Sequence, residues 1–180
     1  MSTAHHRKKH PETVRRHLLA ATARLLLEKG PSSVTLDAVS QAAGVSKGGL
    51  LHHFPNKPAL LDGLFDELTQ RFDRALAARM ASDPEAKGRF TRAYVAVCFG
   101  EQEDGEEWKA LTVALISEPH LRERLGAWVD GRGEADSAPD AALVRYAVDG
   151  VWLADLLGAP VMTPAERDAL MTRLVAMSCP

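Results

Sequence analysis

The chain has 180 residues, of which 46% are hydrophobic and 26% charged, and its formal net charge is −2. That length suits one compact domain or two small ones, and the hydrophobic fraction is enough for a sizeable core. Two cysteines cannot supply a disulfide framework. No segment has the pattern of a signal peptide, and no apolar run approaches the roughly 18 residues that span a bilayer. We therefore expect a soluble, cytoplasmic protein with no membrane partner.

The charge is divided unevenly along the sequence. Residues 1–57 contain nine Lys or Arg against three acidic residues, a balance of +6, whereas residues 58–180 balance at −8. A basic module joined to an acidic body predicts that a polyanion binds at one end of the molecule. The first residues, with His5, His6 and His10 among basic neighbours, favour a basic arm that follows DNA over the alternative of a metal-binding tract.

The first predicted elements are helices. Apolar residues recur at helical spacing from Pro11 to Lys29, and Gly30-Pro31 ends that helix. Residues 35–57 then predict two short helices joined by a tight turn. Gly44 suits the positive φ that ends a helix, and Ser46 is an N-cap for the next one. This is helix-turn-helix geometry, with the second helix offered to a DNA major groove.

Residues 45–57, Val-Ser-Lys-Gly-Gly-Leu-Leu-His-His-Phe-Pro-Asn-Lys, resemble the recognition helix of the tetracycline-repressor (TetR/AcrR) family, and the resemblance covers about residues 12–65. It implies a dimeric, all-helical repressor whose C-terminal domain senses a small molecule. The chain departs from the family at Gly49, where Thr, Ala or Ser is common, and at Leu51, where a Tyr hydroxyl could hold a phosphate. The positions that match DNA-facing positions of the family are Thr35, Ser46, Lys47, Gly48, Gly49, Leu51, His52 and Lys57.

Within that set, Lys47 is assigned to a phosphate or a guanine edge, His52 to a phosphate or a base, and Lys57 to a phosphate. Thr35 and Ser46 have a competing role as helix caps. A helix that begins at Lys57-Pro58 carries an apolar stripe towards Met80, and it would act as the lever between a ligand and the DNA-binding end.

Further helices are expected at about 84–100, 106–117, 119–130 and 139–157, and from Pro164 onwards. Five acids in residues 101–107 favour a solvated connection over a metal site, and residues 131–138 predict a flexible loop. The helix at 139–157 is apolar on nearly every side, which predicts pairing with its copy in a second subunit; burial within one monomer is the alternative. The expected dimer-interface residues are Ala147, Gly150, Val151, Ala154, Leu170 and Leu174.

The family resemblance implies a small-molecule site among the helices of the second part, and such sites are mostly aromatic with a few polar groups. His120 and Asp155 are possible polar contacts, and an aromatic site near acids would suit a lipophilic cation. A plain core role is equally open for each aromatic residue. The candidate ligand-binding residues are Phe90, Tyr94, Trp108, Leu111, Leu115, Trp128, Tyr146 and Trp152.

Together these patterns predict an all-α protein of about nine helices, with a basic arm and helix-turn-helix domain at residues 1–57 and a ligand-sensing and dimerisation domain at residues 58–180. The sequence shows no catalytic spacing, metal motif or cofactor motif, so we expect no enzyme activity and no cofactor. The function favoured is a homodimeric repressor that binds double-stranded DNA at an inverted repeat and is released by a small aromatic or lipophilic effector. The alternatives are a DNA-binding regulator without a ligand, architectural or activating, and a helical carrier or enzyme.

Overall fold

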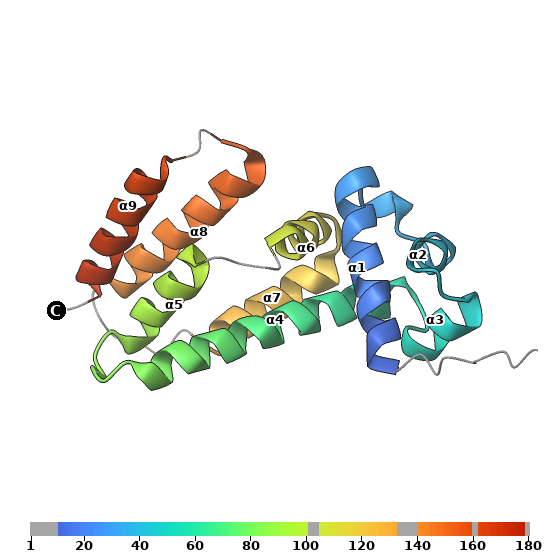
Figure 1. Ribbon diagram of the computed structural model, residues 1–180, viewed down its shortest axis with the longest axis horizontal. Helices are drawn as coiled ribbons and strands as arrows, with labels where there is room; N and C mark the ends of the chain where they lie inside the picture. Colours follow the sequence, from blue (N-terminus) through green and yellow to red (C-terminus); the bar gives the residue numbers. More distant parts are fainter. Residues whose placement is uncertain (1–10, 101–104, 133–139, 160–161, 179–180) are drawn as a thin grey trace, which may run out of the picture. The chain divides into compact units, whose positions relative to one another are not determined.

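The computed structural model describes residues 11–100, 105–132, 140–159 and 162–178 (Figure 1). Every regular element in these ranges is helical, which confirms the all-α class. The expected basic arm, most of the acidic connection and most of the loop before residue 139 lie outside the described residues. The elements are α1 (Pro11–Lys29), the 3₁₀ helix η1 (Pro31–Ser33), α2 (Leu36–Ala43), α3 (Lys47–His53), α4 (Lys57–Ser82), α5 (Arg89–Phe99), α6 (Gly105–Ser117), α7 (Pro119–Asp130), α8 (Ala141–Leu157) and α9 (Pro164–Met177).

The chain divides into two compact units that are not consecutive in sequence. Unit 1 comprises Met1–Leu68 and Asp104–Glu123, and unit 2 comprises Thr69–Glu103 and Arg124–Pro180. Unit 1 therefore contains α6, which packs directly against α1 (Figure 1). The sequence-based division at residue 57 assigned α6 to the second part, because no local pattern shows which distant helix an apolar face will meet.

The helix-turn-helix forms through the local signals that the sequence predicts. The Thr35 hydroxyl caps α2 by accepting a hydrogen bond from the Ala38 amide at 3.1 Å. Gly44 ends α2 with φ 64°, and the Ser46 hydroxyl caps α3 by accepting from the Gly49 amide at 3.2 Å. Each cap satisfies a backbone donor that a helix end leaves without a partner. The turn between α2 and α3 is thus set by its own residues.

Unit 1 fixes α3 through a buried phenylalanine. Leu50 is fully buried, and Phe54, which follows α3, is only 4% exposed. The Phe54 ring lies against the backbone of Gly63 in α4, with the Arg15 guanidinium 5.8 Å from the ring centroid. Arg15 also forms a 2.7 Å ion pair with Glu67. These contacts tie α1, α3 and the start of α4 together behind the recognition helix.

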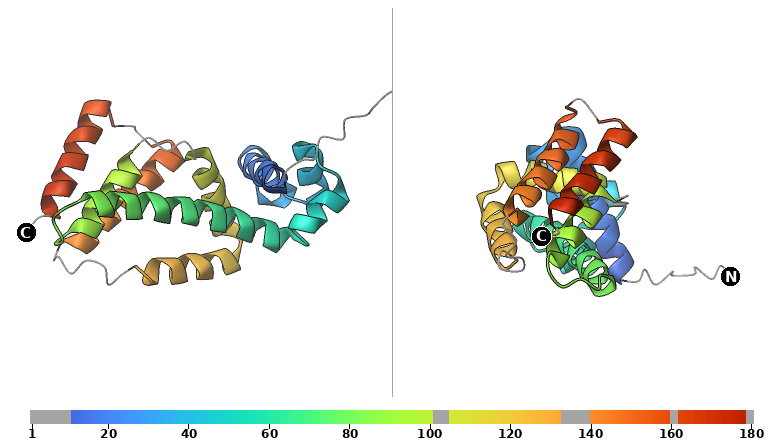
Figure 2. Two further views of the ribbon diagram at one scale, coloured as in Figure 1. Left: turned by 60° about the horizontal axis from the view of Figure 1, so that its bottom comes forward. Right: turned by 90° about the vertical axis from the view of Figure 1, so that its left-hand side faces the viewer.

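In unit 2, α5, α8 and α9 pack side by side (Figure 2). Their core consists of Val95, Val144, Val148 and Leu174. The capping box predicted at the start of α9 is present, since Thr163 and Glu166 exchange hydrogen bonds between side chain and backbone. None of the described helices combines the length and apolarity that crossing a bilayer requires.

Helix α5 begins later than the sequence indicates, at Arg89 rather than near residue 84. Gly88 has φ 72°, a left-handed conformation that interrupts a helix. Before it, the Asp83 carboxylate accepts a hydrogen bond from the Glu85 amide at 2.9 Å and from Arg92 Nε at 2.7 Å. Asp83 therefore stabilises an irregular segment before Arg89, where the sequence predicts a helix that begins at Pro84.

Candidate nucleic-acid interface and effector site

The recognition helix α3 presents one face to solvent. Thr35, Ser46, Lys47, Gly48, Leu51 and His52 are all exposed, whereas Leu50 between them is buried. Leu51 is unusual for a solvent-facing position, with 41% of a large apolar side chain exposed. Six of the eight expected DNA-facing residues are thus exposed to solvent.

The contact that holds the Lys47 side chain on this face is weak. Lys47 forms a 2.9 Å ion pair with Asp37, but both side chains are more than half exposed, so the pair contributes little to stability. A Cβ atom added at Gly48 would meet no atom within 4 Å, whereas one at Gly49 would lie 3.1 Å from Val45 and 3.2 Å from Ser46. Backbone at Gly48 can therefore approach a base edge closely.

Lys57, which was expected to contact a phosphate, makes two contacts within unit 1. Its ammonium group donates to the Pro31 carbonyl at 3.0 Å and forms an ion pair with Glu118 at 3.0 Å. It therefore joins η1 to the segment between α6 and α7 inside unit 1. No local pattern indicates these contacts, because both partners of Lys57 are distant along the chain.

Unit 2 contains a cluster of four aromatic rings. Phe72 contacts Trp128 with ring centroids 5.5 Å apart and Tyr94 with centroids 5.8 Å apart, both edge to face. Phe90 stacks on Tyr94 at 6.2 Å. Three of these residues were expected to bind a ligand, and Phe72, which the sequence shows only as part of an apolar stripe, completes the group.

Two polar side chains, Asp149 and Cys98, lie beside Tyr94 at the edge of the aromatic cluster. The Tyr94 hydroxyl donates a hydrogen bond to Asp149. Burial raises the pKa of Tyr94 above its usual range, and the charge of Asp149 adds to that rise. Burial also raises the pKa of the neighbouring Cys98 thiol to about 12, so the thiol stays protonated and unreactive at neutral pH.

The other expected ligand residues lie on α6 and α8. Trp108, Leu111 and Leu115 belong to α6 in unit 1, where both leucines are buried. Tyr146 is 76% exposed on α8, so it does not line a site within one chain. Asp155 is engaged with Arg167 at 2.7 Å, and His120 lies 3.6 Å from Asp62 in unit 1.

Helix α8 exposes an apolar seam, which consists of Leu143, Tyr146, Gly150, Leu153 and Leu157. The four large side chains are between 46% and 76% exposed, and the positions alternate in spacing by three and four residues. That spacing is the pattern with which one helix packs along another. Of the interface residues expected from sequence, Gly150 lies on this seam, whereas Leu174 is only 4% exposed in the core of unit 2 and is corrected to a core residue.

An exposed recognition helix on an all-helical body defines the class of protein, a helix-turn-helix transcriptional regulator. Residues 18–64 match the family model described as bacterial regulatory proteins of the tetR family, and residues 88–178 match the tetracyclin repressor-like C-terminal domain. The chain belongs to the TetR family of bacterial regulators, as the resemblance of residues 45–57 predicts.

Individual relatives agree with this assignment. The HTH-type transcriptional regulator CymR of Pseudomonas putida is 30% identical over 85% of this chain and 70% of its own length. The HTH-type transcriptional repressor AcnR of Corynebacterium efficiens is 30% identical over 78% of this chain and 69% of its own. The structure of the multidrug binding protein EbrR complexed with malachite green is 26% identical, with TM-score 0.67 over 91% of this chain and 96% of EbrR. The curated relatives are regulators rather than enzymes.

Proposed function

We propose that the protein is a ligand-responsive repressor that binds an inverted-repeat operator as a homodimer. Residues 1–57 are assigned to DNA binding and residues 58–180 to ligand sensing and dimerisation. The observation that carries the proposal is the exposed face of α3, where Lys47, Leu51 and His52 stand clear of the core. Such a face can enter a major groove without unfolding any part of unit 1.

Homodimer formation is supported by the seam on α8. A monomer rarely leaves a contiguous row of large apolar side chains in water, so the seam needs a partner surface. A second copy of the chain supplies the same helix, and a two-fold axis pairs the seam with itself. Two recognition helices would then meet major grooves about one helical turn, ~34–36 Å, apart, which requires an inverted-repeat operator.

Release by an effector is proposed as a shift between two dimer states. The long helix α4 starts beside the recognition helix in unit 1 and continues into unit 2, where Phe72 belongs to the aromatic cluster. A ligand that binds the cluster better in one state than in the other favours that state. The relative EbrR is described as a multidrug binding protein and was solved in complex with malachite green, which supports a small-molecule effector for this chain.

The test is selection of bound sequences from a random DNA pool, followed by affinity measurements at several salt concentrations. We expect an inverted repeat whose affinity falls steeply with salt, since phosphate contacts release counterions. The substitution Lys47→Gln should weaken binding and lower the salt slope by about 1 for each half-site, as expected for one lost phosphate contact. If Lys47 reads a guanine instead, the preferred base at one position should change.

Lys109→Gln is the matched control. Lys109 is also a partly exposed lysine in an ion pair, with Glu106 at 2.6 Å, but it lies on α6 away from α3. Its replacement should leave both affinity and salt slope unchanged. Absence of any enriched motif would overturn operator binding. A stable operator complex that no compound in a chemically diverse set releases would favour the ligand-independent regulator.

A further inference from the structure

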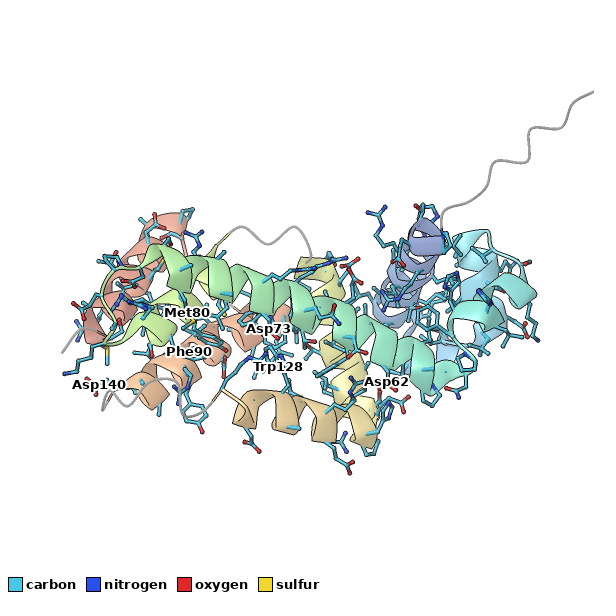
Figure 3. All side chains as sticks on the ribbon, turned by 90° about the horizontal axis from the view of Figure 1, so that it is seen from below. Asp62, Asp73, Met80, Phe90, Trp128 and Asp140 are labelled. Atoms are coloured by element: carbon cyan, nitrogen blue, oxygen red, sulfur yellow. The ribbon has the colours of Figure 1, made fainter. Side chains whose placement is uncertain are left out.

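One arginine in unit 2, Arg132, contacts both an aromatic ring and a carboxylate of the same chain. The Arg132 guanidinium carbon lies 4.0 Å from the centroid of the Trp128 ring, at the distance of a cation–π contact. The same guanidinium forms an ion pair with Asp73 and donates to the Trp128 carbonyl. Figure 3 shows Asp73 and Trp128 close together between α4 and α7.

The two groups that hold Arg132 are fixed without it. The Trp128 indole donates to Asp73 through Nε1 at 3.3 Å, which orients the carboxylate beside the ring. Phe72 packs edge-on against the indole at 5.5 Å, and through Phe72 the site joins the aromatic cluster with Tyr94. An indole face beside a carboxylate attracts a delocalised cation by ring quadrupole and by charge.

Arg132 itself is placed so that it can leave. It follows the last residue of α7, Asp130, in a turn where the Arg132 amide bonds the Val129 carbonyl. Its side chain is 24% exposed and that of Asp73 is 40% exposed, so solvent reaches the ion pair. Rotation of the Arg132 side chain would free the ring and the carboxylate without breaking a turn of α7.

A second arginine in unit 2 also contacts an aromatic ring and a carboxylate. Arg167 lies 5.0 Å over the Phe99 ring and pairs with Asp155 at 2.7 Å. Phe99 packs, like Tyr94, against the core formed by α5, α8 and α9, but among the described residues its ring makes no ring–ring contact with the cluster around Phe72. An arginine, an acid and a ring are thus common to both places, and the continuous aromatic surface distinguishes the Arg132 site.

We propose that Asp73 and Trp128 form a subsite for a flat, delocalised organic cation that carries N–H donors, and that Arg132 fills this subsite until the effector displaces it. The cation would lie on the indole in place of the guanidinium and donate to the freed carboxylate. The aromatic frame of the ligand would extend towards Phe72 and Tyr94. This inference rests on the proposed ligand-responsive function and names its ligand class.

The experiment measures binding of ethidium, a flat cation with amino groups, to the full-length protein without DNA, because ethidium also binds DNA. Isothermal titration gives the affinity, and phenanthridine, the uncharged parent ring system, reports the contribution of shape alone. Arg132→Gln removes the internal competitor and should tighten ethidium binding at least about threefold, the effect of one exposed cation–π contact. Because Asp73 also holds Arg132, Asp73→Asn is measured in the Arg132→Gln background. There it should weaken ethidium binding at least about fivefold, as expected for a lost charge-assisted hydrogen bond, and leave phenanthridine binding unchanged.

Arg167→Gln is the matched control and should alter neither affinity. Arg132→Met provides the same comparison if the Gln variant has a lower melting temperature than the parent. The proposal is overturned if the Arg132 variants bind ethidium no more tightly than the parent, if Arg167→Gln has the same effect, if Asp73→Asn has none, or if no variant binds ethidium. Failure of operator selection would instead refute the repressor function, whatever the ethidium result.

Discussion

The contact between Gly63 and Phe54 makes the stability of unit 1 sensitive to a single methyl group. A Cβ atom at residue 63 would lie 2.5 Å from Phe54 Cε1 and 3.1 Å from its Cζ. Carbon atoms prefer separations of about 3.5–4.0 Å, so the ring would have to retreat by about 1 Å. The ring is buried, and Leu19 stands 3.4 Å from the same added atom. Overpacking of this kind costs up to about 3 kcal/mol, and the helix gains about 1 kcal/mol when Ala replaces Gly.

Gly63→Ala should therefore lower the free energy of unfolding by about 2 kcal/mol. Gly126→Ala is the matched control, because Gly126 lies inside α7 with nothing within 4 Å of an added Cβ. That variant should gain about 0.5–1 kcal/mol. Urea denaturation followed by circular dichroism measures both. The argument fails if Gly63→Ala is as stable as the parent while Gly126→Ala is stabilised.

Three further predictions address α9, the dimer and base recognition. Hydrogen bonds from the Thr163 backbone and hydroxyl lower the pKa of Glu166 below its ordinary 4.5, so their contribution to stability is present above that pH and is lost as pH falls through the lowered value. Thr163→Ala should cost about 1 kcal/mol at neutral pH and less in acid, and denaturation at pH 7 and pH 3 would refute this if the loss were equal. Leu153→Glu should place a charge in the α8 seam and convert the dimer to monomer in sedimentation, whereas an unchanged dimer would place the interface elsewhere. Leu51 should contact a thymine methyl group, so that deoxyuridine in place of one operator thymine weakens the parent but not Leu51→Ala; equal losses in both proteins would exclude that contact.

The helix-turn-helix was predictable because its signals are local. Gly44 and Ser46 each act within a few residues, through a left-handed turn and a cap, and the structure has both. The capping box at Thr163 was predictable for the same reason. Such patterns fix where helices begin and end without reference to the rest of the chain.

Long-range partners were not predictable from the same patterns. Lys57 matches a DNA-facing position of the family, but its partners Pro31 and Glu118 come from other elements. Arg132 belongs to a stretch whose composition indicates a flexible loop, so nothing in the sequence places it on Trp128. Helix α8 is apolar on nearly every side, and only its packing shows that Tyr146 faces solvent within one chain.

The central claim is that two copies of the chain present their recognition helices to one operator as a fixed pair. It is tested most directly by the affinity for the selected inverted repeat before and after insertion of five base pairs between its halves. The insertion turns the half-sites by about half a helical turn, so the dimer can engage only one of them. We predict that affinity falls to that of an isolated half-site and recovers in part when ten base pairs are inserted. Equal affinity for all three spacings would show that the copies bind independently and would contradict the dimeric repressor.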